Sequence, residues 1–139
     1  MEFEKTLSDL KDAARIEDWD SVDLSIPVIA RDPRFYEWAF KEGMEEINVD
    51  VRDLAASIIE KSDIEAREFS RMRDALFVHM TSDENKYVRF RLAFALAKHG
   101  SGEYKRQVVD VLKEASTDKD VKEIANRYLH RIVHQKVTR

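Results

Sequence analysis

The chain has 139 residues, which suits one domain and leaves little room for two. With only three Gly and two Pro, the composition excludes a turn-rich β-sandwich or barrel. The absence of Cys excludes disulfide scaffolds, thiolate zinc sites and cysteine nucleophiles. The charged share of 37% and the net charge of −4 are typical of a chain with a large solvated surface.

No segment of the sequence has the character of a membrane span. The longest uninterrupted apolar stretch is the six residues 92–97, whereas a spanning helix needs about 20. The first residues are acidic and contain no apolar run of the kind found in a secretory signal. We therefore expect a cytoplasmic protein that does not associate with membranes.

Residues 1–31 contain two stretches with apolar side chains at helical spacing. The first stretch consists of Phe3, Leu7, Leu10 and Ala14. The second begins at Trp19-Asp20-Ser21-Val22-Asp23 and continues with Ile26, Ile29 and Ala30. Pro27 lies inside this second stretch and would cost a helix about 3 kcal/mol, so we expect the helix to kink or restart there.

Residues 32–61 and 62–100 repeat the pattern of two amphipathic stretches. Asp32-Pro33 predicts a helix start, and Asn48-Val49-Asp50-Val51-Arg52 precedes the apolar residues Ala55, Ala56, Ile58 and Ile59. Ser62-Asp63-Ile64-Glu65 reads as a capping box, and Gly100 as a helix stop. Between them, Asp83-Glu84-Asn85-Lys86-Tyr87-Val88-Arg89 precedes Leu92, Ala93, Ala95 and Leu96.

Residues 101–135 carry a fourth copy, and residues 136–139 form a tail. Tyr104, Val108, Val111 and Ala115 give the first stripe; Asp118-Lys119-Asp120-Val121-Lys122, followed by Ala125, Tyr128 and Leu129, gives the second. Valines at 22, 51, 88 and 121 anchor the four copies. The pattern predicts a single all-α domain made of about four helix hairpins, each too small to bury its stripe alone.

The spacing Asp-x-Asn-x-x-Val-Arg-x-x-Leu-Ala-x-Ala-Leu at 83–96 resembles the second helix of a HEAT-like, armadillo-type repeat. The resemblance implies a short right-handed α-α superhelix over residues 1–139, with the second helices lining a concave face. Arg52, Arg89 and Lys122 each follow an anchor valine. They suit either a ladder of charge pairs with the acidic turns of adjacent repeats, as the resemblance implies, or a row of phosphate contacts.

Charge is distributed unevenly along the chain. Residues 1–85 carry 11 basic and 22 acidic side chains, and residues 86–139 carry 13 and 6. The basic C-terminal half suits a polyanion, a head-to-tail contact with an acidic end, or a solvated face without a partner. Positions six past the anchors, Ser57, Phe94 and Arg127, should point away from the core, although Phe94 equally suits packing between repeats. The candidate binding surface consists of Arg91, Phe94, Lys98, Arg127, His130 and Arg131.

Catalytic and metal-binding candidates are few. His130 and His134 share a helix face, but no third ligand is fixed by spacing, so we expect no metal site. The segment Trp19-Asp20-Ser21-Val22-Asp23 is similar to one in HEAT-like DNA alkylation-repair glycosylases. That resemblance implies Asp23 as a catalytic carboxylate and Trp19 as its aromatic partner, whereas Asp23 alone also suits a helix-terminal cap.

Without a phosphate-binding glycine loop or a nucleophile elbow, the sequence favours a module without cofactors or catalysis. The leading hypothesis is a protein-binding scaffold that presents its concave face and basic end to another protein. The alternative is a nucleic-acid-binding protein related to the alkylation-repair proteins, using the basic C-terminal half. Neither the partner nor the oligomeric state follows from the residues.

Overall fold

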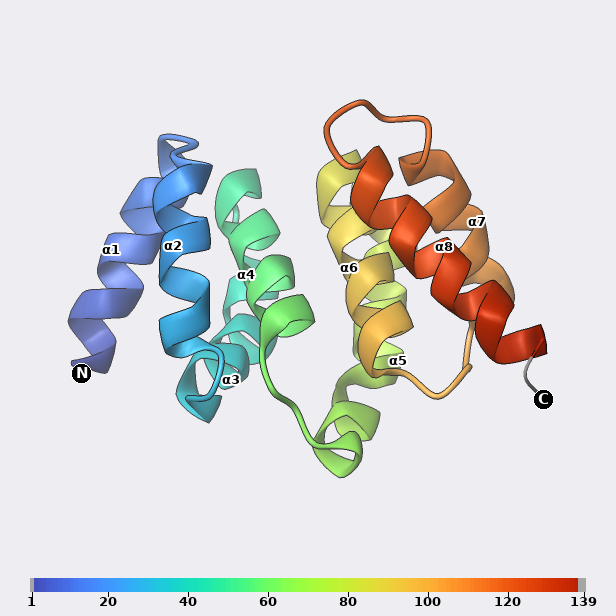
Figure 1. Cartoon of the computed structure of the whole chain (residues 1–139). Helices are drawn as coiled ribbons and strands as arrows, with labels where there is room; N and C mark the ends of the chain where they lie inside the picture. The colour runs from blue at the N-terminus through green and yellow to red at the C-terminus, as the bar shows by residue number, and fades with distance from the viewer. Residues whose placement is uncertain (1, 138–139) are drawn as a thin grey trace.

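The computed structural model describes residues 2–137, with side chains described up to Ile132. This part contains eight α-helices, one short 3-10 helix and no strand (Figure 1). None of its helices is long and apolar enough to cross a membrane. The elements are α1 (Phe3–Arg15), α2 (Trp19–Ile29), α3 (Pro33–Lys41), η1 (Gly43–Glu45), α4 (Val49–Lys61), α5 (Ala66–Ser82), α6 (Lys86–His99), α7 (Lys105–Ala115) and α8 (Lys122–Val137).

The all-α prediction is confirmed, and the two helices of each successive pair pack together, as do α6 and α7. Each predicted segment contains one pair of α-helices, although α8 continues to Val137, beyond the boundary expected at residue 135. The even-numbered helices α2, α4, α6 and α8 run from top to bottom of the view in one row, in which α8 slants outward. The odd-numbered helices form the other row, with α3 and α5 behind the first and α1 and α7 toward its two outer sides (Figure 1). Contacts between pairs run mainly through α4 and α6.

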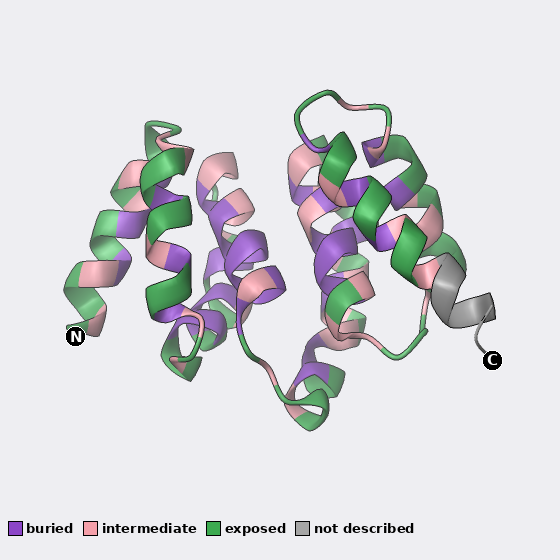
Figure 2. Ribbon diagram, in the orientation of Figure 1, coloured by how far each residue is buried: buried purple, intermediate pink, exposed green. Residues whose placement is uncertain are grey.

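The apolar stripes predicted from spacing form the core. The anchors Val22, Val51, Val88 and Val121 are all buried, although Val121 lies one residue before α8 rather than within it. In the middle of the row, α4 is buried from Leu54 to Glu60 and α6 from Leu92 to Leu96, whereas α2 and α8 keep exposed faces (Figure 2). The middle helices are covered because a helix lies on each side of them and others lie behind.

Capping side chains fix where several helices begin. The Asp32 carboxylate accepts a hydrogen bond from the Arg34 amide, and Asn48 and Asn85 each accept from two amides of the helix that follows. The capping box expected at Ser62 is wrong. Its amide donates to the Ile58 carbonyl, so Ser62 closes α4, and α5 begins only at Ala66.

Pro27 does not divide α2, so of the two expected outcomes, a kink or a restart, the restart does not occur. The helix runs through it from Trp19 to Ile29, and the Pro27 ring is exposed. Because Pro27 stands only two residues before the end of the helix, it removes one hydrogen bond, the one to the Asp23 carbonyl, in the last turns. The cost of the proline is therefore local.

Candidate functional site

Three polar side chains lie on one face of the buried helix α4. Asp53, Ser57 and Glu60 are four and three residues apart, so they form a stripe along the helix. The burial of the two acidic side chains is unusual, since that of Asp53 is 16% exposed and that of Glu60 only 5%. A carboxylate removed from water in this way needs a cation or a donor beside it.

Arg91 of α6 supplies that cation. Its Nε lies 3.5 Å from Asp53 Oδ1, and its Nη1 lies 3.9 Å from Glu60 Oε1. These four atoms are buried and form no hydrogen bond within the described structure. Arg91 therefore attracts the two carboxylates as an ion pair, without a direct hydrogen bond. Burial raises the pKa of Asp53, and the charge of Arg91 opposes the rise. Two carboxylates around one guanidinium leave one excess negative charge when all three groups are ionised.

Two aromatic side chains complete the cluster. The Tyr128 hydroxyl of α8 donates to Glu60 Oε2 at 2.8 Å, and burial together with the Glu60 charge raises the pKa of Tyr128, which therefore stays a donor. His99 Nε2 lies 2.9 Å from the carbonyl oxygens of Ile59 and Glu60. Carbonyls only accept, so Nε2 carries the proton, and burial lowers the pKa of His99 so that the ring stays neutral.

The sequence did not point to this cluster as a unit. Of the two placements open to Phe94, exposed among cations or packed between repeats, the structure shows the second: the side chain is fully buried and stacks on Tyr128 with ring centroids 5.4 Å apart. Ser57, which was expected to point away from the core, is buried too. The expectation assumed that each second helix has a bare face. It fails because α8 covers this side of α6, and α6 covers the corresponding side of α4.

The remaining cations of the predicted binding surface are exposed on α6 and α8. Lys98, Arg127 and Arg131 form no ion pair with another described side chain, and His130 is exposed beside them. The Arg131 guanidinium lies 5.3 Å from the centre of the Tyr128 ring. The role of these cations in binding stays a prediction.

The predicted ladder of charge pairs with acidic turns is found at Arg52, whereas Arg89 pairs with an acidic side chain of helix α7. Arg52 Nε donates to Asp83 Oδ2 at 2.8 Å, and its Nη1 donates to two carbonyls of the loop before α4. Arg89 repeats the arrangement one hairpin later, donating to the Asp83 carbonyl and to Glu114 Oε1 at 3.1 Å. Lys122 is exposed and forms no ion pair with the side chains described. The Arg52 contact with Asp83 thus joins neighbouring hairpins, while its Nη1 contacts fix the loop of its own hairpin.

Trp19 and Asp23 lie one turn apart on α2. The Asp23 carboxylate is largely exposed and lies 3.6 Å from Lys61 Nζ on α4, while Trp19 is half-buried against the core. The two residues are thus on the same helix, but Asp23 forms an interhelical ion pair instead of a helix cap. Base excision through this pair stays a prediction.

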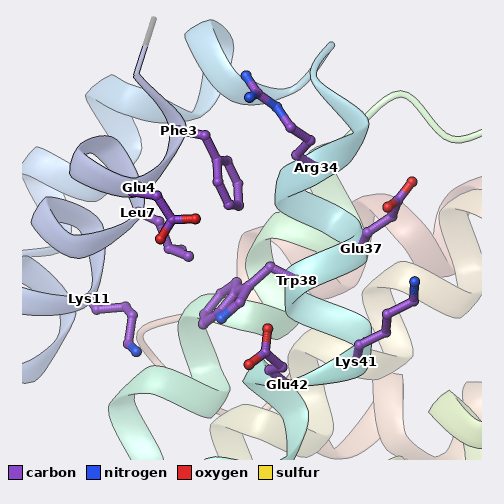
Figure 3. A pocket seen from close by; sticks show the side chains of 9 residues that line it. All are labelled: Phe3, Glu4, Leu7, Lys11, Arg34, Glu37, Trp38, Lys41 and Glu42. Carbon is purple, nitrogen blue, oxygen red and sulfur yellow. The ribbon is translucent and has the colours of Figure 1, made fainter.

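A pocket of about 370 Å³ lies between α1 and α3 (Figure 3). Its apolar wall comes from Phe3, Leu7 and Trp38, and charged side chains of both signs surround it. Cations already cover its rings: the Arg34 guanidinium lies 5.0 Å from the Phe3 ring centre and Lys11 Nζ 5.8 Å from that of Trp38. Neither Trp19 nor Asp23 lines this pocket, and its chemistry indicates no particular ligand.

Metal binding finds no support in the side chains up to Ile132. No group of three His, Asp or Glu residues among them is placed to hold an ion. The side chain of His134 lies outside the described residues, so the predicted face shared by His130 and His134 is untested.

No protein-family model, no curated protein and no solved structure matches the chain. The resemblance of residues 83–96 to a HEAT-like repeat therefore rests on those residues alone.

Proposed function

We propose that the chain is a short α-solenoid of the HEAT type that binds another protein and has no catalytic role. Four helix pairs packed in chain order, with their second helices parallel in one row, support the solenoid. The Arg52 and Arg89 contacts between hairpins support it further, since repeat proteins reuse equivalent positions in this way. In such a stack the row of second helices is the natural binding face.

The distribution of charge along that row carries the proposal of a protein partner. At one end, α2 exposes Asp20 and Asp23; at the other, α8 exposes Arg127 and Arg131. Between them, Arg91 of α6 offsets one of the two buried carboxylate charges of α4, so the middle of the row offers no exposed cation from this cluster. A polyanion is attracted to the α8 end but repelled by the α2 end, whereas a protein surface offers both signs.

Nucleic acid is the alternative, and two observations weaken it. Phe94 is buried and offers no face to a base, and Arg91 lies between two carboxylates. The exposed set of Lys98, Arg127 and Arg131 keeps the alternative testable.

The test is affinity capture from lysate treated with nuclease, followed by mass spectrometry. We expect at least one protein to be retained by the wild type and lost with Arg127→Glu/Arg131→Glu. The matched control is Lys105→Glu/Arg106→Glu, which makes the same charge change on exposed positions of α7 in the other row and should retain it. Equal capture by both variants would contradict binding through α8.

Fluorescence anisotropy with labelled DNA and RNA decides on the alternative. We expect no saturable binding at about 150 mM salt, where exposed charges are screened beyond about 8 Å. Binding that falls steeply with salt and disappears in the Arg127→Glu/Arg131→Glu variant would replace the protein partner by nucleic acid.

A further inference from the structure

The first helix of the row has an apolar strip that nothing in the described structure covers. Leu24 and Val28 lie one turn apart on α2 and are 79% and 64% exposed. Asp20 is exposed one turn before Leu24, and Asp23 is exposed on the side toward α4, 3.6 Å from Lys61 Nζ. Large apolar side chains adjacent to one another and rimmed by charge are typical of a surface that binds a partner.

The last helix of the row offers the complementary chemistry. Arg127 and Arg131 lie one turn apart on α8, both exposed, and Arg131 rests over the Tyr128 ring. An arginine side chain presents an apolar stem below a charged head. Two such side chains in a row therefore match two apolar residues with exposed carboxylates nearby.

The sequence as a whole shows the same separation of charge, with an acidic N-terminal part and a basic C-terminal part. Residues 1–85 have a net charge of −11 and residues 86–139 a net charge of +7. Two copies therefore attract one another when the acidic end of one faces the basic end of the other, and repel one another when like ends meet.

We propose that a second copy of this chain covers the α2 strip, with α2 of each copy on α8 of the other. Exposed residues of α2 and α8 lie on the same side of the molecule (Figure 2). A two-fold axis parallel to the helices of the row therefore forms both contacts at once and closes the assembly at two chains. The inference rests on the proposed function, because it names the partner of the same face.

Sedimentation velocity over a concentration series tests the pair with two complementary charge reversals. Asp20→Lys/Asp23→Lys makes both ends of the row basic, and Arg127→Glu/Arg131→Glu makes both ends acidic. Each variant alone should raise the dissociation constant of the pair by about tenfold or more. Mixed in equal amounts, the two variants should recover a two-chain particle, because each now complements the other.

Two controls separate contact from folding. Lys105→Glu/Arg106→Glu should dissociate like the wild type, and Leu24→Ser/Val28→Ser should weaken the pair without changing charge. All variants are first shown to be folded by circular dichroism.

A wild type that is monomeric at every concentration, a mixture that does not recover, or particles that grow beyond two chains would overturn the closed pair. If the wild type is monomeric and the Arg127→Glu/Arg131→Glu variant still fails to capture a protein that the wild type retains, the two-chain assembly is refuted. The proposed protein-binding function is then unaffected.

Discussion

Replacing Arg91 by Met is the most direct test of the buried cluster. Methionine fills a similar volume without the charge, so the variant leaves Asp53 and Glu60 on α4 without their cation. Tyr128 still donates to Glu60 and the charge of Lys61 still acts on Asp53, but no other described side chain forms an ion pair with Asp53. The variant therefore measures the cost of leaving buried carboxylates without their cation.

The size of the effect follows from burial and distance. Removing one partner of a buried ion pair costs about 3–5 kcal/mol. Arg91 is 22% exposed, and its nitrogens lie 3.5 and 3.9 Å from the carboxylate oxygens, longer than direct hydrogen bonds. We therefore expect the lower end, a loss of about 3 kcal/mol in the free energy of unfolding at neutral pH. Protonation of Asp53 should reduce the loss at acidic pH.

Urea unfolding followed by circular dichroism measures this loss. With an m-value between about 1.5 and 2 kcal/mol per M, the midpoint should fall by about 2 M. The control Arg127→Met removes an exposed arginine from α8 and should cost less than about 0.5 kcal/mol. A loss for Arg91→Met below about 1 kcal/mol would show that the cluster is solvated like a surface ion pair, and the reasoning would fail.

Three further substitutions extend the test, each measured by chemical unfolding. Asp53→Asn should be neutral or stabilise by about 1 kcal/mol at neutral pH, because it leaves Arg91 balanced by Glu60 alone. Burial raises the pKa of Asp53 above its ordinary 3.8, so the wild type loses stability relative to this variant as pH rises through that raised value. At about pH 4 the two proteins should converge, and a gap that stays constant with pH would contradict this assignment. Tyr128→Phe should cost about 2 kcal/mol by removing the donor to Glu60, and an unchanged midpoint would show that another donor replaces it. Asn85→Ala should lower the free energy of unfolding by about 1 kcal/mol, because two amides of α6 lose their hydrogen-bond acceptor. An unchanged free energy of unfolding would show that water caps the helix equally well.

The helix pairs were predictable because their signals are local. Asp32, Asn48 and Asn85 mark helix starts through hydrogen bonds to residues two or three positions away. Spacing of apolar residues identified the faces that became the core. Ser62 shows where a local pattern is ambiguous. A serine with a glutamate three residues later also fits the end of one helix followed by an extended link.

The candidate site was less predictable because it depends on which helices become neighbours. Arg91 and Phe94 lie on α6 at positions that would be exposed on a helix with one covered face. The apolar run 92–97 was a usable signal, since a helix that is apolar all round has no bare face. Asp53 and Glu60 in the otherwise apolar α4 were a second signal, because acids placed there need a cation from another helix.

The hydrogen bond from Tyr128 to Glu60 has a consequence for how the chain unfolds. It joins residues 68 positions apart and passes beyond the adjacent hairpin, from the fourth helix pair to the second. In a strictly nearest-neighbour array the terminal unit can peel away while the others persist. Here detachment of the C-terminal helix deprives an interior carboxylate of its donor. Loss of the end and disruption of the middle should therefore occur as one transition, which a denaturation curve probed at both places would show as coincident midpoints.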